Sequence, residues 1–168
     1  MIESEGELCR CLFLTERFDE CIALAQSVLA RDRGASFGAM SVLLRYLMLA
    51  QACSGRRVEA RQTVLEAMPR WRRHGLLLAS GPLSVMLAEW GCLADAARVG
   101  AAANAHLSRL QIEWYPSMHQ LNERRQALAA TAGCSSDDLA RWQREGEALD
   151  EASIAAICLH AAQEAPAA

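Results

Sequence analysis

The feature that most constrains the fold is a run of small residues at helical spacing between Leu93 and Leu110. At 100° per residue, four residues fall within about 40° of Ala96 and form one stripe with it on an α-helix: Gly100, Ala103, Leu107 and Leu110. Arg98 and Arg109 fall on the opposite side. Small side chains let a neighbouring helix approach closely. The sequence therefore predicts a packing helix with one buried face and a solvated back.

A turn followed by a helix recurs three times, in the segments TERFDECIAL, SGRRVEARQT and WGCLADAARV. Each segment passes through polar residues to one small residue: Cys21, Ala60 or Ala96. These positions are 39 and 36 residues apart, near the period of about 34 of tetratricopeptide repeats. We expect the small residues at close crossings of paired helices, as in stacked helical repeats. The alternative is an irregular helical bundle with a chance similarity.

Apolar periodicity and capping residues predict about nine helices, and no stretch alternates long enough to predict a strand. The expected helices span about residues 3–14, 18–31, 36–54, 57–73, 76–90, 93–110, 116–132, 136–147 and 150–162. Pro82 lies inside the fifth helix, which therefore either kinks there or begins at Ser80 as its N-cap; we favour the later start. The predicted class is all-α: antiparallel helical pairs stacked as a tetratricopeptide-like right-handed superhelix.

Composition narrows the functional classes. A hydrophobic content of 52% over 168 residues supports one domain, expected over residues 1–163, with a frayed tail over 164–168. The formal charge of −3 argues against a surface built for direct nucleic-acid binding. Charges interrupt every apolar run before membrane-spanning length. We therefore expect a cytoplasmic protein with no membrane contact.

The seven cysteines are odd in number and lack chelating spacing. Cys9 and Cys11 would point about 200° apart on a helix, which disfavours a shared metal. We interpret the cysteines as small core residues in a reducing compartment, and we expect neither a metal nor a cofactor.

From Leu87 to about Leu159 the chain resembles a known family through a series of short motifs. They are Ala96-Ala97, Gly100-Ala101-Ala102, Pro116 after an irregular link, Ala132-Gly133, Trp142 before Glu145-Gly146, and Leu149-x-Glu151-Ala152. This pattern is similar to the C-terminal end of the tetratricopeptide-type helical region in large bacterial transcriptional regulators. Those proteins join a LuxR-type or winged-helix DNA-binding domain to a STAND-type NTPase module. The resemblance makes residues 93–163 a C-terminal cap.

The chain lacks the phosphate-binding loop and the recognition helix of those regulators, so their ATPase and DNA-binding activities are not carried over. The resemblance implies a non-catalytic regulatory module that binds a protein partner or a small-molecule inducer. We expect its binding surface on the concave side of the stacked first helices. One alternative is a free-standing adaptor that self-associates as a homodimer. The other is an unrecognised helical enzyme.

Two groups of residues are candidates for partner or ligand binding. The first is a cluster of six arginines around Trp71 and His74, which also contains Arg56 and Arg72 and whose binding candidates are Arg57, Arg61, Arg70 and Arg73. Its alternative is a solvated helix face near a C-terminus, where the helix dipole favours cations, and we favour that alternative. Trp71 itself shares a stripe with Val64 and Met68, which predicts a core position.

The second candidate is the aromatic pair Trp114 and Tyr115, since aromatic side chains in a loop can anchor a partner. An alternative that the sequence supports equally is that the pair fills a gap between helices. We find no nucleophile elbow, no catalytic triad order and no histidine pair at chelating spacing, and we therefore predict that the chain is not an enzyme.

Overall fold

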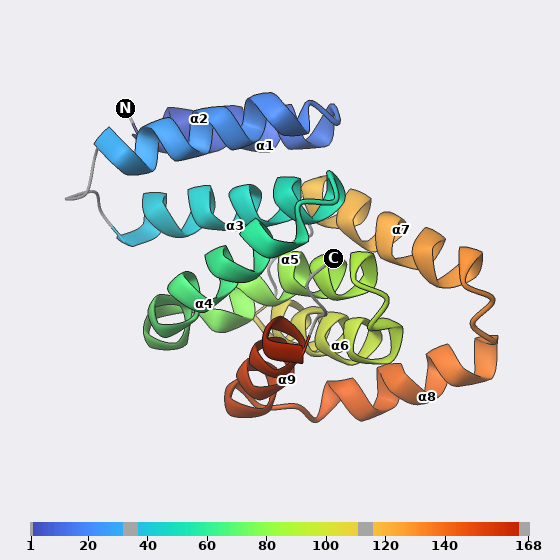
Figure 1. Cartoon of the computed structure of the whole chain (residues 1–168). Helices are drawn as coiled ribbons and strands as arrows, with labels where there is room; N and C mark the ends of the chain where they lie inside the picture. The colour runs from blue at the N-terminus through green and yellow to red at the C-terminus, as the bar shows by residue number, and fades with distance from the viewer. Residues whose placement is uncertain (1, 32–36, 111–115, 165–168) are drawn as a thin grey trace.

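The computed structural model describes residues 2–31, 37–110 and 116–164, and over these ranges the chain forms nine α-helices and no strand (Figure 1). They are α1 (Ile2–Leu14), α2 (Phe18–Arg31), α3 (Phe37–Cys53), α4 (Arg57–His74), α5 (Leu76–Glu89), α6 (Leu93–Arg109), α7 (Pro116–Thr131), α8 (Ser136–Glu147) and α9 (Glu151–Glu164). The predicted all-α class is confirmed, while the right-handed superhelix stays a prediction. Most of the predicted frayed tail lies outside the described residues.

The turns that join α1 to α2, α3 to α4 and α5 to α6 share one backbone geometry. Each contains a residue with positive φ: Glu16 at 57°, Gly55 at 77° and Gly91 at 81°. In each turn the next residue's N–H bonds back to the carbonyl five residues earlier: Arg17 to Leu12, Arg56 to Gln51 and Cys92 to Leu87. This is the Schellman type of helix end. The repeated sequence pattern therefore corresponds to a repeated turn, which lies five residues before each predicted small residue.

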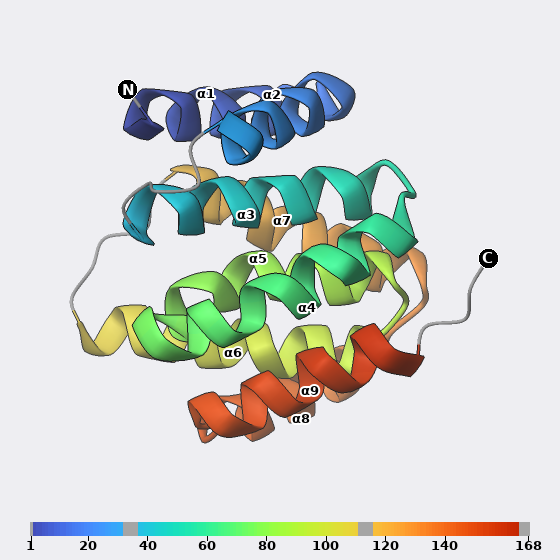
Figure 2. The same ribbon diagram turned by 60° about the vertical axis from the view of Figure 1, so that its left-hand side comes forward.

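Helix α5 lies at the centre of the molecule. It packs against α3, α6, α7 and α9, and every residue from Ala79 to Ala88 is buried. Figures 1 and 2 show α1 and α2 at one end of the stack and α8 and α9 at the other, with α3, α5 and α6 between them. A helix that is buried on all sides needs its polar groups satisfied. Ser80 Oγ donates to the Leu76 carbonyl and Ser84 Oγ to the Gly81 carbonyl.

The favoured start of the fifth helix at Ser80 is wrong, because α5 begins at Leu76 and continues through Pro82. Proline has no N–H, so the Leu78 carbonyl four residues earlier loses its helical donor. Arg45 of α3 supplies the missing donor, with its Nη1 3.0 Å from the Leu78 oxygen. The helix therefore continues past the proline because a neighbouring helix completes its hydrogen bonding.

The predicted solvated back of α6 is also wrong in part. Helices α5, α7 and α8 all pack against α6, and Ala97 and Ala101 are buried alongside the predicted stripe. Arg98 is only half-exposed and lies against α8, where it pairs with Glu145. Leu110, the last member of the stripe, is 53% exposed. The sequence shows one face of small residues, whereas three neighbouring helices make most of α6 a core element.

Glu16 is the one non-glycine residue with positive φ among the described residues, at a turn position where the other two pairs have glycine. An L-residue with a side chain in this region loses about 1 kcal/mol relative to glycine. We expect Glu16→Gly to be more stable than Glu16→Ala by about 1 kcal/mol in urea denaturation. Both variants lose the exposed contact of Glu16 with Arg124, so their difference isolates the backbone effect. Equal stabilities would contradict the assigned turn.

The link between Arg45 and Pro82 can be measured with a double-mutant cycle. Arg45→Met should lower the unfolding free energy by about 1 kcal/mol, because it removes the side chain that donates to the Leu78 carbonyl. In a Pro82→Ala background the new N–H can reach that carbonyl, so the same substitution should cost less. The bond from Arg45 Nε to the Ser41 carbonyl is lost in both backgrounds and cancels. Strictly additive effects would rule out the compensation.

Candidate functional site

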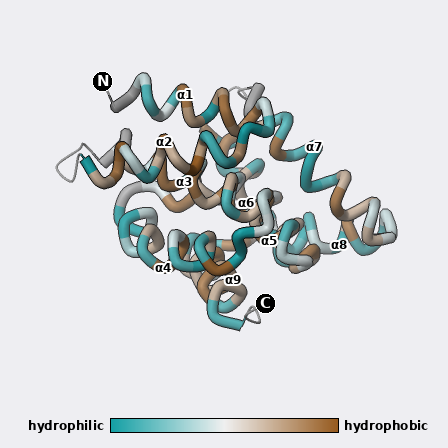
Figure 3. Tube along the Cα trace, turned by 45° about the horizontal axis from the view of Figure 1, so that its top comes forward, coloured by the Kyte–Doolittle hydropathy of each residue, from teal (hydrophilic) through white to brown (hydrophobic). Residues whose placement is uncertain are grey.

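One face of α7 docks onto the helix stack through two positions that lack a side chain. Met118, Leu121 and Arg125 are spaced by three and four residues and share this face. A Cβ atom at Gly81 of α5 would lie 2.6 Å from Met118 Cε, and one at Gly100 of α6 would overlap the Arg125 guanidinium. Glycine at both positions therefore makes room for α7. Figure 3 shows that α7 carries hydrophilic and hydrophobic residues along its length, as a helix with one packed face does.

Arg125 is a buried cation with neutral partners. The residue is 7% exposed, and its Nη1 donates to the Ala96 carbonyl at 3.3 Å while Nη2 donates to Asn122 Oδ1 at 2.5 Å. Burial lowers the pKa of the Arg125 guanidinium. Its neighbour Arg124, by contrast, pairs with the Glu89 carboxylate at 2.6 Å. In the described part of the chain no carboxylate forms a salt bridge with Arg125.

A groove opens beside Arg125 between α6, α7 and α8, with a volume of about 230 Å³. Its lining is mostly apolar and comprises Leu93, Ala96, Ala97, Arg125, Gln126, Ala129, Leu139 and Gln143. Gln126 and Gln143 are exposed and stand at the rim, whereas Ala97 and Ala129 are buried in the walls. The groove thus combines an apolar wall with one buried cation, a combination suited to orienting a small ligand.

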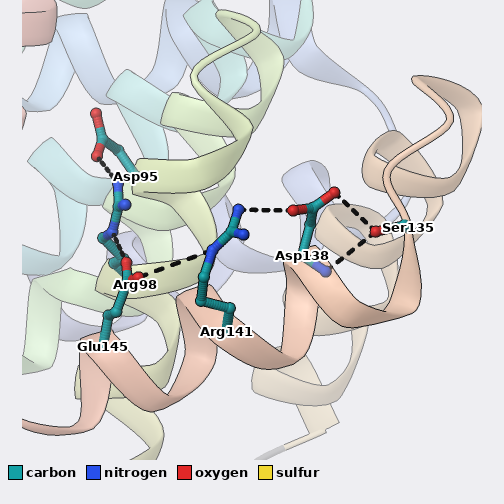
Figure 4. Close-up of polar contacts among 6 residues, drawn as sticks. All are labelled: Asp95, Arg98, Ser135, Asp138, Arg141 and Glu145. Carbon is teal, nitrogen blue, oxygen red and sulfur yellow. Dashed lines mark hydrogen bonds and ion pairs between the residues drawn. The ribbon is translucent and has the colours of Figure 1, made fainter.

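The wall formed by α8 is held against α6 at close range. A Cβ at Gly146 would overlap the backbone carbonyl of Arg98, so glycine allows the two backbones to meet. An ionic ladder runs along the outside of this contact (Figure 4). It joins Asp95, Arg98, Glu145, Arg141, Asp138 and Ser135 in that order.

Two residues of the ladder have pKa values that are shifted by their hydrogen bonds. Arg98 Nε lies 2.7 Å from Glu145 Oε2, and this bond raises the pKa of the Arg98 guanidinium. At the start of α8, Ser135 Oγ accepts from the Asp138 N–H and donates to its carboxylate. That hydrogen bond, with Arg141 nearby, holds the pKa of Asp138 below its usual range. Each exposed pair contributes little alone, so the glycine contact and the buried alanines of α6 carry most of this interface.

A second cavity, of about 290 Å³ and here called the inner cavity, lies between four helices. Its lining comes from α1, α3, α5 and α7: Glu7, Arg10, Val42, Arg45, Tyr46, Pro82, Met118 and Leu121. Arg10 pairs with Glu7 at 2.5 Å, and Arg45 donates to backbone carbonyls. We expect a partner on the concave side of the predicted superhelix, and α7 of the same chain shares a cavity with α1, α3 and α5.

The predicted arginine cluster is spread over different contacts. Arg57 donates to the Trp90 carbonyl and lies 5.6 Å from the centre of that ring. Arg61 donates to carbonyls at the end of α9, where the helix dipole favours a cation. Arg70 Nη1 lies 3.3 Å from the Met40 sulfur, and Arg73 is exposed. The structure therefore places Arg57 and Arg61 in contacts between elements. Their binding role stays a prediction.

The other predicted residues divide into buried and undescribed positions. Trp114 and Tyr115 lie outside the described residues. Trp71 is fully buried, as its stripe with Val64 and Met68 predicts. The five predicted helix-packing residues are all buried: Cys21, Ala60, Ala96, Gly100 and Ala103.

Arg125 and its partner Asn122 are not among the residues predicted from the sequence. A signal was present, because Arg125 follows Met118 by seven residues and so falls on the apolar face of α7. The pattern alone does not say which small residue of another helix lies opposite it.

The thiols of Cys53 and Cys158 are poorly suited to nucleophilic chemistry. All seven cysteines are free, and Cys9, Cys21 and Cys158 are buried, whereas the exposed Cys11 departs from the predicted core role. Burial raises the pKa of Cys53 and of Cys158 to about 12, so both remain protonated at neutral pH. Across the described ranges, no three His, Cys, Asp or Glu side chains gather closely enough to hold a metal ion. None of the helices described is long and apolar enough to cross a bilayer.

Comparisons of the chain with protein-family models, with curated proteins and with solved structures found no match. The resemblance to bacterial regulators therefore stays a prediction from the motifs between Leu87 and Leu159.

The wall of the groove can be tested through Gly146. We expect Gly146→Ala to lower the unfolding free energy by about 1–3 kcal/mol, because the added methyl group meets backbone and α8 must move. The matched control is Gly38→Ala in α3, where a Cβ would meet nothing within 4 Å. That control should be neutral or stabilising by up to about 1 kcal/mol. Chemical denaturation measures both, and a similar effect at the two sites would refute the close contact.

Proposed function

We propose that the chain is a non-catalytic, ligand-binding regulatory module whose ligand site is the groove between α6, α7 and α8. The observation that supports this most directly is Arg125, a buried guanidinium that borders an apolar groove and contacts only neutral oxygens. A guanidinium stays protonated at physiological pH and cannot act as a general base, so its chemistry in this groove is recognition.

Helix α7 provides a route by which binding could be transmitted. It forms one wall of the groove and one wall of the inner cavity, and it also packs against α1 and α5. In Figure 1, α7 runs from the level of α3 down to the turn before α8. A ligand changes the position of α7 only to the extent that it binds one position better than another. Occupation of the groove would thereby bias the helices around the inner cavity.

The resemblance suggests the kind of protein in which this module acts. We propose that it serves as the sensor end of a bacterial transcriptional regulator, in which the bound ligand or partner controls a neighbouring domain. This part of the proposal depends on the motifs of residues 93–163 and on the repeated turns of the first three helix pairs.

An NMR titration of the ¹⁵N-labelled chain with small acidic, neutral and basic fragments tests the site. We expect the largest shifts at amides of α6, α7 and α8 around the groove, with smaller ones along α7 toward the inner cavity. Gln143→Trp places a bulky group at the groove rim and should weaken these shifts. The matched control is Gln163→Trp on an exposed position of α9. Fragment binding confined to other surfaces, or unaffected by Gln143→Trp, would overturn the proposal.

A further inference from the structure

We propose that the groove between α6, α7 and α8 binds a small organic carboxylate, with the acid group on Arg125 and an apolar body against the alanine and leucine wall. This inference rests on the proposed function in that both use the same groove. It adds the chemical class of the ligand.

Arg125 has hydrogen-bonding capacity that its present partners do not fill. A guanidinium has five N–H donors, and the two bonds here go to Ala96 O and to Asn122 Oδ1. The Ala96 carbonyl lies within α6 and also serves that helix as a backbone acceptor. A carboxylate would offer a charged acceptor in fork geometry, and such bonds are about twice as strong as neutral ones.

In the described part of the chain, no carboxylate of the surrounding elements forms an ion pair with Arg125. Asp95 and Glu145, on α6 and α8, pair with Arg98 on the outside of their interface. Glu89 of α5 pairs with Arg124. Glu123 is exposed and lies two residues before Arg125, which places it on a different side of α7. Arg125 thus lines the groove with no carboxylate paired to it in the described part of the chain.

The walls define the rest of the ligand. Leu93, Ala97, Ala129 and Leu139 present apolar surface, and the rim glutamines are uncharged. A phosphate or sulfate would press several polar oxygens against these walls without partners, which is costly. A carboxylate concentrates its charge at one end and leaves an apolar body to be buried. The volume of about 230 Å³ lies below the range of drug-sized pockets, which favours a short aliphatic or single-ring acid.

Isothermal titration with matched acids and amides tests the inference directly. The probes are hexanoate and benzoate, each compared with its own amide, which has nearly the same shape and no charge. We expect at least one acid to bind about tenfold or more tightly than its amide. NMR shifts from the same acid should lie at the groove amides of α6, α7 and α8.

Two variants test whether Arg125 causes the preference for the acid over its amide. Arg125→Met keeps an unbranched apolar side chain over Gly100 and should abolish the preference for the acid over the amide. Gln143→Glu adds a carboxylate at the exposed rim, where it should compete with the acid and weaken its binding about tenfold. Gln143→Met is the control for the rim position and should keep the preference. If Arg125→Met does not fold, the comparison of Gln143→Glu with Gln143→Met decides alone.

The outcomes separate the two proposals. Acids and amides that bind the groove equally would overturn the carboxylate inference and leave the proposed function standing. Acids that shift only residues near exposed arginines such as Arg72 and Arg73 would also overturn it. Binding of no fragment in the groove, whatever its charge, would overturn both.

Discussion

The buried contact of Arg125 with Gly100 is one of the points at which α7 joins the stacked pairs. Gly81 and Gly100 have no side chain where Met118 and Arg125 lie, and this lets α7 pack closely on α5 and α6. The cost of burying a guanidinium without a carboxylate is offset in part by two neutral hydrogen bonds. A buried guanidinium without a carboxylate is therefore not explained by its contribution to the stability of the fold. It becomes understandable if the cation is kept for an anion that the chain does not itself provide.

The two glycine contacts of α6 differ in kind. At Gly100 the neighbour is the flexible end of a side chain, which can withdraw, whereas at Gly146 it is the backbone of α6 itself. The α8 wall of the groove is therefore fixed to α6, while the α7 wall is held by side chains. The two walls of the groove thus differ in what holds them: backbone contact for α8 and side-chain packing for α7.

Much of the fold was predictable from local sequence. Helix starts and ends followed from glycine turns and capping residues, since these signals act within a few residues, as at Gly55, Gly91 and Ser135. The start of α5 was mispredicted because the partner of its orphan carbonyl, Arg45, lies 33 residues away in the chain. The candidate site was harder to predict than the helices, because it too depends on residues that lie far apart in the chain. The position of Arg125 on the apolar face of α7 could be read from spacing, but its burial against Gly100 depends on how two distant helices pack.

The bond between Arg45 and the Leu78 carbonyl also has a consequence for how the protein folds and opens. A helix normally completes its own hydrogen bonds as it forms, independently of its neighbours. Here the side-chain donor for the Leu78 carbonyl comes from α3. The bond couples the two helices, so we expect the opening of α3 to loosen this turn of α5. Amide hydrogen exchange in the middle of α5 would report the opening of α3 as well as its own.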